Sequence, residues 1–552
     1  MIIYQVFTRL FGNRLSTRKT WGTIAENGCG KLNDFDVETL KWIKYMGVTH
    51  LWFTGVIRHA TQTDYRRHGI PAQHAAVVKG KAGSPYAITD YYDIDPDLAT
   101  DVSHRMEEFE ALVSRVHQAG MKVIIDFVPN HVAREYRSLC KPKGVKDLGE
   151  DDDVSLHFSP RNNFYYCWGQ SLDLVRIPTA EGAKPYTERP AKATGNDHFS
   201  NRPGPTDWYE TVKLNYGIDY CDAGGRSEHF APMPDTWQKM TDILLFWAGK
   251  GIDGVRCDMA EMVPDAFWAY ATATVKAQYP DLKFIGEVYN PDLYRTYIHA
   301  GFDYLYDKVG MYDCLRDVIC GRRSTADITA QWQRTDDIQG HMLYFLENHD
   351  EQRIASDFFA GDAWRAIPAH LVSCLLQTNP YMLYAGQELG ERGMDSEGFS
   401  GLDGRTTIFD YWSLGTLQRG YFDRKKRTAD EKALSLAYQL VMLIAEREKA
   451  ASEGQSFDLM YVNPQLAPRQ YAFLRKAGKE MLLVVANFSQ DVAYCKVNIP
   501  RHAFDYLSIP EKTLTAEDLL TKQKQLFVLR PDTAAEMEVP ANGGVVYKFK
   551  WR

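Results

Sequence analysis

The chain has 552 residues, too many for one simple core, and its 45% hydrophobic and 25% charged residues are ordinary for a soluble globular protein. Its net charge of −8 comes without a basic stripe, so nucleic acid is not expected as a partner. No run of about 18 apolar residues occurs, so no membrane-spanning helix is expected.

The N-terminus and the cysteines both bear on the cellular compartment. The chain starts at Met1 and shows neither the basic-then-apolar stretch nor the small-residue cleavage site of a secretory signal. The nine cysteines are scattered from Cys29 to Cys495 without a Cys-x-x-Cys pair, which is typical of free thiols. We therefore predict a cytoplasmic protein. Its oligomeric state is left open.

Short apolar segments alternate with amphipathic helical segments, such as 106–119 and 236–248, along the first 450 residues. Buried parallel strands are continuous apolar runs, and their alternation with helices indicates βα units. Eight such units favour an α/β fold, a closed (β/α)8 TIM barrel, over the alternative of a doubly wound open sheet. The eight predicted strands are residues 2–7, 48–53, 121–127, 252–256, 283–286, 302–306, 342–346 and 381–384.

Two connections are too long for an ordinary crossover. Residues 128–251 separate the third strand from the fourth, and their excess, 132–225, is rich in Gly, Pro, Asn, Asp and aromatic residues. One helix cannot use such a length, so we predict a loop-rich subdomain inserted after the third strand. The second strand is followed by residues 59–84, which we predict to form a surface loop near the barrel mouth.

Helical periodicity becomes weak after residue 450. Residues 470–475 and 481–489 are predicted to form a hairpin that turns at Ala477-Gly478-Lys479, with further strands at 492–499 and 545–550. We therefore predict three parts. They are a barrel of residues 1–131 and 226–450, an inserted subdomain of residues 132–225, and a C-terminal antiparallel β-sandwich of residues 451–552.

Carboxylates and histidines follow four of the predicted strands, at the face that carries the active site in TIM barrels. After the fourth strand, Arg256 and Asp258 share a face, so the arginine is expected to keep the aspartate ionised and to lower its pKa. An oriented, ionised carboxylate is what a glycosidase nucleophile requires. Taken alone, this segment is explained equally well by a plain ion pair at a strand end.

The fifth strand leads into Glu287, which has apolar and aromatic neighbours. Such surroundings raise the pKa of a carboxyl group and suit a general acid. A carboxylate that interacts with the start of the next helix, near Asp292, is the simpler explanation of this segment alone.

Two more segments carry polar side chains at strand ends. The seventh strand is followed by Asn348-His349-Asp350, and the third leads through Asp126 into Pro129-Asn130-His131. Turn-forming polarity explains either segment by itself. Four such segments in order, after strands three, four, five and seven, indicate an active site.

These four segments resemble the four sequence regions of the α-amylase family, glycoside hydrolase family 13. The matching residues are 126–131, 254–258, 286–287 and 348–350. Three more segments resemble the family's first strand, the segment after its second strand and its eighth strand: residues 4–7, 84–96 and 383–388. The resemblance covers nearly the whole chain.

The resemblance implies a retaining glycoside hydrolase that cleaves α-1,4, or alternatively α-1,6, glucosidic bonds in maltodextrins, starch or related α-glucans. Asp258 would be the nucleophile, Glu287 the general acid and base, and Asp350 would favour the transition state. The carboxyls of Asp258 and Glu287 would lie about 5–5.5 Å apart. Four side chains would orient the nucleophile or bind the sugar at the cleaved bond: Tyr86, His131, Arg256 and His349.

The sequence departs from the family's pattern around a calcium site. Asn130 matches one family calcium ligand, but Glu261-Met262 stand where many members carry Lys-His, and Lys213 stands where many carry Asp. Because calcium takes about six to eight oxygen ligands, we predict no firm metal site and no required cofactor. Lys213-Leu214-Asn215 and Ala260 resemble the neopullulanase and cyclomaltodextrinase subgroup.

Two other functions fit the same residues. A transglycosylase would pass the glucosyl group to a sugar instead of water. A catalytically inactive α-glucan-binding protein would share the barrel, although all the catalytic residue types are present here. In each case the expected partner is an α-glucan oligosaccharide or polysaccharide. Aromatic residues of the insert, such as Trp168, Trp208 and Tyr209, are each expected in its core rather than in the cleft.

Overall fold

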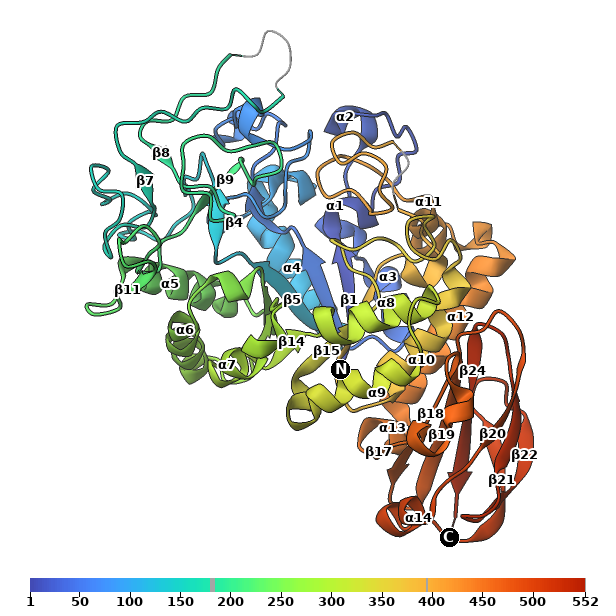
Figure 1. Cartoon of the computed structure of the whole chain (residues 1–552). Helices are drawn as coiled ribbons and strands as arrows, with labels where there is room; N and C mark the ends of the chain where they lie inside the picture. Colours follow the sequence, from blue (N-terminus) through green and yellow to red (C-terminus); the bar gives the residue numbers. More distant parts are fainter. Residues whose placement is uncertain (179–183, 394–395, 552) are drawn as a thin grey trace.

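The computed structural model describes residues 1–178, 184–393 and 396–551. At its centre is a closed barrel of eight parallel strands, which confirms the predicted fold class. Figure 1 shows the inserted segment at the upper left of the barrel and the C-terminal part at the lower right. The barrel strands are β1 (Ile2–Phe7), β2 (His50–Thr54), β5 (Lys122–Phe127), β12 (Gly254–Cys257), β13 (Lys283–Gly286), β14 (Tyr304–Tyr306), β15 (Met342–Phe345) and β16 (Tyr381–Tyr384).

Side chains from alternate strand positions fill the inside of the barrel. A larger apolar cluster includes the intervening positions and packs the strands against the surrounding helices. The barrel is therefore a packed core, and its polar residues gather at the rim. The inner cluster contains Ile3, Trp52, Ile124, Ile285, Tyr306, Tyr312, Leu343, Phe345 and Met382.

The helices around the barrel each bury one apolar face. In α4 (Arg105–Gln118), Phe109, Leu112 and Val116 recur at helical spacing and are buried. At the start of α12 (Ala429–Arg447), Thr428 and Glu431 form a capping box that satisfies two free backbone N–H groups. The other helices are α1 (Thr8–Phe11), α2 (Ile24–Asn27), α3 (Val37–Tyr45), α5 (Asp235–Gly249), α6 (Asp265–Gln278), α7 (Tyr294–His299), α8 (Asp313–Ile319), α9 (Ala326–Arg334), α10 (Ile367–Leu375), α11 (Gly415–Leu417) and α13 (Lys449–Ser452).

The two long connections carry little regular structure. Between β2 and β5, a hairpin of β3 (Ile57–His59) and β4 (Ile88–Ile94) encloses a long loop. Between β5 and α5, short strands pair into small antiparallel sheets, as predicted for a loop-rich insertion. The pairs are β6 (His131–Ala133) with β9 (Thr211–Lys213), β7 (Tyr166–Cys167) with β8 (Ala191–Lys192), and β10 (Ile218–Asp219) with β11 (Ser227–Glu228).

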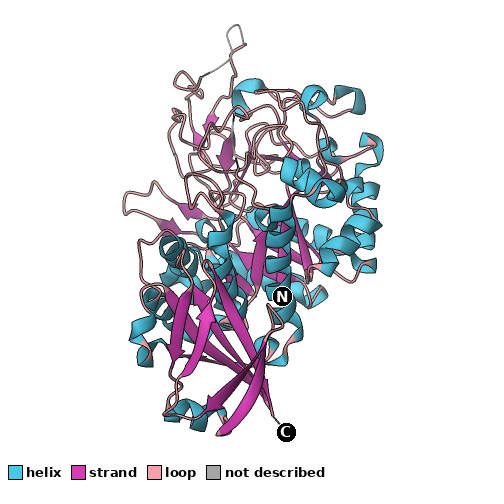
Figure 2. Cartoon of the chain, turned by 90° about the vertical axis from the view of Figure 1, so that its right-hand side faces the viewer, coloured by secondary structure: helices cyan, strands magenta, loops and turns pink. Residues whose placement is uncertain are grey.

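The C-terminal part is antiparallel, as predicted, and the expected hairpin is formed by β18 (Gln470–Ala477) and β19 (Glu480–Asn487). Six strands form one sheet, and β20 and β23 form a second one that packs on it. Figure 2 shows this sheet at the opposite end of the molecule from the loop-rich insertion. The remaining elements are β17 (Gln455–Asp458), β20 (Ala493–Val497), α14 (Arg501–Leu507), β21 (Lys512–Asp518), β22 (Lys524–Leu529), β23 (Ala535–Val539) and β24 (Gly543–Lys550).

Three further facts complete the description. All nine cysteines are unpaired. Among the described residues, no helix combines the length and apolar character needed to cross a bilayer. The predicted insertion, barrel and C-terminal part each include residues outside the description: 179–183, 394–395 and 552, respectively.

We predict that Gly83→Ala destabilises the fold at the base of the long loop. Gly83 has φ +77°, and an added Cβ would lie 1.7 Å from the carbonyl oxygen of Ala60. Gly144→Ala is the matched control, because Gly144 has φ +85° but no atom within 4 Å of an added Cβ. The backbone strain, roughly 1–2 kcal/mol, is common to both variants. Calorimetry should show a larger drop in melting temperature for Gly83→Ala; equal drops would refute the clash.

Candidate active site

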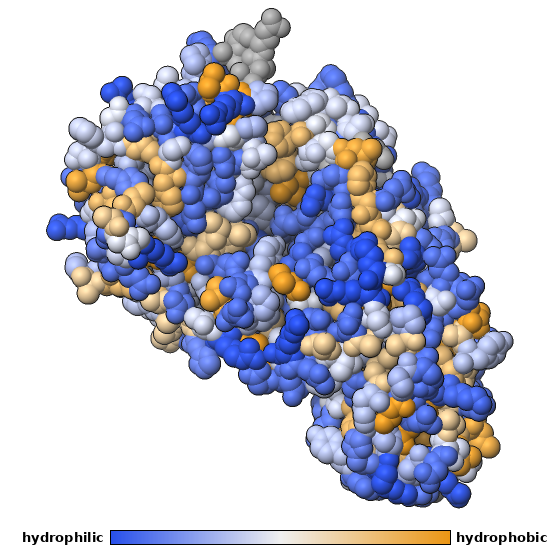
Figure 3. Space-filling view, viewed as in Figure 1, coloured by the Kyte–Doolittle hydropathy of each residue, from blue (hydrophilic) through white to orange (hydrophobic). Residues whose placement is uncertain are grey.

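The sequence-predicted site residues meet at the C-terminal rim of the barrel. Asp258 and Glu287 directly follow β12 and β13, and Asp350 lies in the loop after β15. These three, with Tyr86 and His131, line one cavity of about 350 Å³. Figure 3 shows a hollow between the inserted segment and the loops across the barrel mouth. The other lining residues are Lys79, Ser84, Trp208, Glu210, Thr211, Met259, Tyr289, Ile408 and Phe409.

Arg256 lies fully buried beneath this cavity and contacts several of its carboxylates. Its Nη1 donates to Asp258 Oδ1 at 2.8 Å and to Asp126 Oδ1 at 3.1 Å. Its Nη2 lies 2.7 Å from Glu287 Oε2, an ion-pair distance, although the N–H is not aligned for a hydrogen bond. One guanidinium therefore bridges the two predicted catalytic carboxylates and fixes their relative placement.

The electrostatics of Asp258 differ from the expectation drawn from its arginine neighbour. Burial raises the pKa of Asp258 well above its usual value, and the nearby carboxyls of Glu287, Asp126 and Asp350 act in the same direction. Arg256 lowers the pKa as expected, but its effect is smaller than that of burial. The prediction of a lowered pKa was wrong because it ignored burial and the like charges that the fold gathers. This crowding favours retention of a proton within the cluster.

The carboxyl group of Glu287 is held by partners on both oxygens. Its Oε2 accepts the backbone N–H of Met259 at 2.8 Å, and its Oε1 accepts the hydroxyl of Tyr289 at 2.7 Å. Met259 has φ +44°, a strained conformation for a residue with a side chain. In this conformation the backbone N–H of Met259, the residue after Asp258, points to Glu287. The chain therefore provides a second link between the two carboxylates.

His349 joins the floor of the cavity to Asp350. Its Nδ1 lies 2.8 Å from the Nε2 of Gln5, an amide donor, so the tautomer that fits carries its proton on Nε2. That Nε2 lies 3.0 Å from Asp350 Oδ2 and 2.5 Å from the hydroxyl of Tyr86. Burial acts to raise the pKa of Asp350, but His349, Arg256 and Arg405 outweigh it and lower the pKa to about 2. Asp350 is therefore ionised.

His131 is neutral at ordinary pH, because burial and the nearby Lys213 and Lys79 lower its pKa to about 3. The ring of Trp208 lies 5.2 Å from the His131 ring, centroid to centroid, and lines the cavity. Trp208 was expected in the core of the insertion, so this is a correction. Tyr209 is buried, as expected, with the Lys79 ammonium over its ring, whereas Trp168 is 66% exposed and does not line the cavity, so its predicted place in the core was wrong.

The residues around Asn130 do not fit a calcium ion. Asn130 Oδ1 accepts a hydrogen bond from the ammonium of Lys213. The same ammonium lies 2.7 Å from Asp197 Oδ1 and donates to the carbonyl oxygen of Met262 at 3.3 Å. Lys213 is buried, so its charge occupies the point where these oxygens converge. A divalent cation there would meet a fixed positive charge, with oxygens that are already used.

A second group of metal-ligand side chains is equally unsuited. The ligand atoms of Asp90, Asp93 and Cys140 lie close together. Arg58 lies 3.2 Å from a carboxylate oxygen of each aspartate, and Arg105 Nε donates to Asp93 at 2.7 Å. The two arginines neutralise the cluster, which therefore braces β3, β4 and α4.

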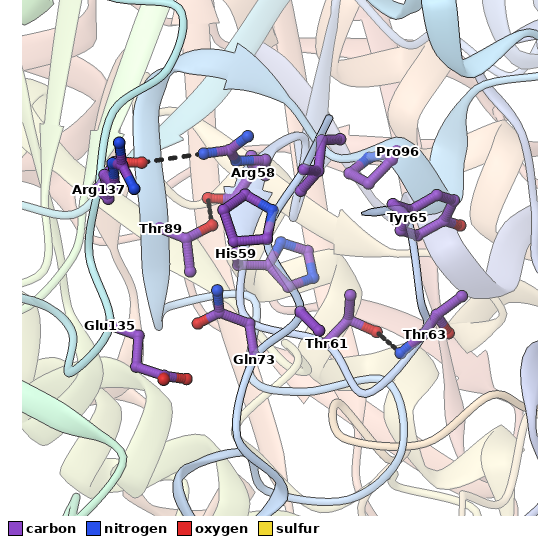
Figure 4. Close-up of a pocket in the computed structure, with 13 residues that line it drawn as sticks. Arg58, His59, Thr61, Thr63, Tyr65, Gln73, Thr89, Pro96, Glu135 and Arg137 are labelled. Carbon is purple, nitrogen blue, oxygen red and sulfur yellow. Dashed lines mark hydrogen bonds between the residues drawn. The ribbon is translucent and has the colours of Figure 1, made fainter. Parts of the chain in front are cut away.

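A smaller cavity of about 100 Å³ adjoins this braced cluster (Figure 4). Arg58 there donates to the backbone oxygen of Arg137 at 3.0 Å, and Thr89 donates to the backbone oxygen of Arg58. His59 lies 3.0 Å from Asp95 and 2.7 Å from Arg9. Arg58 and His59 thus lie against neighbouring carboxylates, and none of the sequence-predicted site residues lines the cavity.

Sequence reasoning missed several residues of the site. Gln5, Trp52 and Tyr306 lie on barrel strands and contact His349, Asp126 and Arg256. A polar Gln5 within an apolar strand was a usable signal. Lys79 and Glu210, which also line the cavity, lie in loops without periodicity, so nothing in the sequence marked them.

An eight-stranded barrel whose carboxylates converge on one buried arginine at the C-terminal rim has the architecture of a glycosidase catalytic domain. Residues 5–439 match the family described as "Alpha amylase, catalytic domain". The chain belongs to the α-amylase family.

Individual relatives are distant. Alpha-amylase 3 of Dictyoglomus thermophilum is 25% identical over 406 residues, which cover 71% of this chain and 64% of that protein. Neopullulanase 2 of Thermoactinomyces vulgaris is 22% identical over 96% of this chain and 76% of its own length. A solved α-amylase from Geobacillus thermoleovorans, complexed with acarbose, has TM-score 0.66 at 18% identity, covering 100% of this chain and 98% of that one. That structural likeness shows the fold alone.

We predict that Asp126→Asn moves the acidic limb of the pH profile of kcat/KM to lower pH. The Asp126 carboxylate raises the pKa of Asp258, so its removal lets Asp258 ionise at lower pH. The profile would be measured with an aryl α-maltoside. Trp52→Phe is the control, since it removes the indole hydrogen bond to Asp126 without changing charge. A limb that stays in place in Asp126→Asn would overturn this electrostatic assignment.

Proposed function

We propose that the protein is a retaining glycoside hydrolase that cleaves α-1,4 glucosidic bonds of α-glucans, with α-1,6 bonds as a second linkage to test. The observation that carries the proposal is the Arg256 bridge between Asp258 and Glu287 inside one cavity. Two carboxyls placed about 5–5.5 Å apart are what a double displacement at a sugar carbon requires. Membership of the α-amylase family supports the same chemistry.

In the proposed mechanism, Asp258 attacks the anomeric carbon while Glu287 donates its proton to the leaving oxygen. The glucosyl–Asp258 ester that forms is then attacked by water, from which Glu287 takes a proton, so both side chains return to their starting states. Arg256 orients Asp258 and favours its ionised form. Burial and the crowding of carboxyls raise the pKa of Asp258, and the Arg256 guanidinium acts against that rise to keep the nucleophile ionised.

The remaining predicted residues are proposed to bind the sugar at the cleaved bond. Asp350, which is ionised, and His349 would bind its hydroxyls. The Asp350 carboxylate would favour the positive charge that develops on the ring. Neutral His131 would bind a hydroxyl at another edge of the sugar. Tyr86, whose ring stacks on His349 with centroids 5.3 Å apart, would lie beneath the sugar face.

The test of this function is a product analysis. Purified protein would be incubated with maltoheptaose, β-cyclodextrin, pullulan and isomaltose, and the products resolved over time. We expect shorter oligosaccharides from the α-1,4-linked substrates. Products longer than the input would indicate a transglycosylase. Absence of any product would indicate an α-glucan-binding protein. As controls, Asp258→Asn and Glu287→Gln should each lower turnover by roughly 10²–10⁴-fold or more while leaving the melting temperature close to wild type.

We also propose that the enzyme needs no calcium, because the Lys213 ammonium takes the place of a cation at Asn130. EDTA should leave both activity and melting temperature unchanged. Lys213→Met should destabilise the protein, since it leaves the Asn130 Oδ1 and the Met262 carbonyl oxygen without their donor, at a cost of about 1–3 kcal/mol for an unsatisfied buried group. Activity that is lost in EDTA and restored by added calcium would refute the proposal.

The division into parts and the compartment also remain proposals. We assign catalysis to the barrel of residues 1–131 and 226–450, part of the cavity wall to the insertion 132–225, and no catalytic group to residues 451–552. Nine unpaired cysteines support a cytoplasmic location, where thiols stay reduced.

A further inference from the structure

One wall of the catalytic cavity carries a charge pair that the proposed mechanism does not use. Lys79 comes from the long loop between β3 and β4, and Glu210 directly precedes β9 in the insertion. Lys79 Nζ lies 3.0 Å from Glu210 Oε2. Both residues line the cavity that contains Asp258, yet Lys79 is only 8% exposed and Glu210 only 4%.

The head groups of Lys79 and Glu210 can each make further hydrogen bonds. Glu210 Oε2 is buried and, among the residues that the structure describes, has no hydrogen-bond partner of acceptable geometry. The hydrogen bond recorded for Lys79 Nζ is a long one, 3.4 Å, to the carbonyl oxygen of Asp207. Taking two charges out of water is unfavourable, and an apolar pair of the same size would pack at least as well. A ligand that hydrogen-bonds to both head groups accounts for their presence at a cavity wall.

The chemistry of this wall suits a neutral, hydroxyl-rich ligand. The ammonium offers donors and the carboxylate offers acceptors, which together match sugar hydroxyls. Trp208 and Phe409 line the same cavity and offer rings on which the apolar face of a sugar packs. A phosphorylated sugar would be repelled by Glu210, because the charge of Lys79 is already balanced.

The position of the pair indicates which sugar it reaches. Lys79 is close enough to His131 to lower its pKa, whereas Glu287 is held by Met259 and Tyr289. The pair therefore lies beside His131, which in the proposed mechanism binds the sugar retained at Asp258. The sugar at Asp258 has its hydroxyls matched by His131, His349 and Asp350 in the proposed mechanism. The next sugar ring is left for Lys79 and Glu210.

We propose that Lys79 and Glu210 bind hydroxyls of the glucosyl unit next to the one at Asp258, on the side away from the cleaved bond. The pair thereby selects a maltosyl unit over a single glucosyl unit. This inference rests on the proposed function, since it takes Asp258 as the point of cleavage.

The test compares 4-nitrophenyl α-maltoside with 4-nitrophenyl α-glucoside in two variants. Glu210→Gln keeps the shape of the side chain, and Lys79→Met/Glu210→Met removes both charges, so no unpaired charge is left buried. The control is Glu188→Gln: Glu188 is paired with Arg134 at 2.8 Å and is 9% exposed, but it does not line the cavity. Melting temperatures would confirm that all variants fold.

We expect the maltoside-to-glucoside ratio of kcat/KM to fall about tenfold in both test variants, mainly through KM, as expected for one charge-assisted hydrogen bond. The ratio should be unchanged in Glu188→Gln. An unchanged ratio in a folded double variant, or equal losses on both substrates, would overturn the inference.

A binding measurement separates this inference from the proposed function. If wild type hydrolyses neither substrate, the proposed function fails, and calorimetric titration with maltotetraose still tests the pair. Weaker binding by the double variant than by Glu188→Gln would then support a sugar-binding role, and equal affinity would exclude one.

Discussion

The active site depends on one buried guanidinium. Arg256 has no exposed surface, so its charge is tolerated only because Asp126, Asp258 and Glu287 surround it. Conversely, three carboxylates could not be buried together at the barrel mouth without a cation among them. Tyr306 accepts a hydrogen bond from the guanidinium and belongs to the cluster inside the barrel, so packing of the core fixes the arginine. The geometry of the proposed catalytic pair, Asp258 and Glu287, is therefore set by the barrel interior.

The sequence predicted the features that depend on neighbouring residues along the chain, and it missed those that depend on contacts between distant segments. Continuous apolar runs located all eight barrel strands, because a strand buried on both faces has few polar positions to interrupt the run. Residues directly after those strands, such as Asp258 and Glu287, could be assigned to one rim for the same reason. The raised pKa of Asp258 could not be predicted, since it arises from burial and from carboxyls on other strands. Trp208, predicted in the core of the insertion, lines the cavity beside His131, a contact between segments that are far apart in the sequence.

Lys213 shows the same limit in another form. The sequence identified Lys213 as a departure from the family pattern, but only the fold shows that its ammonium donates a hydrogen bond to Asn130, 83 residues away. A lysine on β9 therefore ties the insertion to the loop after β5 and, through Met262, to the loop after β12. The lysine side chain that makes these hydrogen bonds is a covalent part of the chain. The positive charge of Lys213 at this point does not vary with metal concentration.

The barrel and the loops supply different parts of the site. The barrel strands supply the carboxylates, and their spacing is constrained by packing that tolerates little change. The two long connections meet above them, where Lys79 and Glu210 form a pair across the cavity wall. Loops accept insertions and substitutions far more readily than packed strands do. The proposed role of Lys79 and Glu210 would therefore let substrate choice change in the loops without disturbing Arg256.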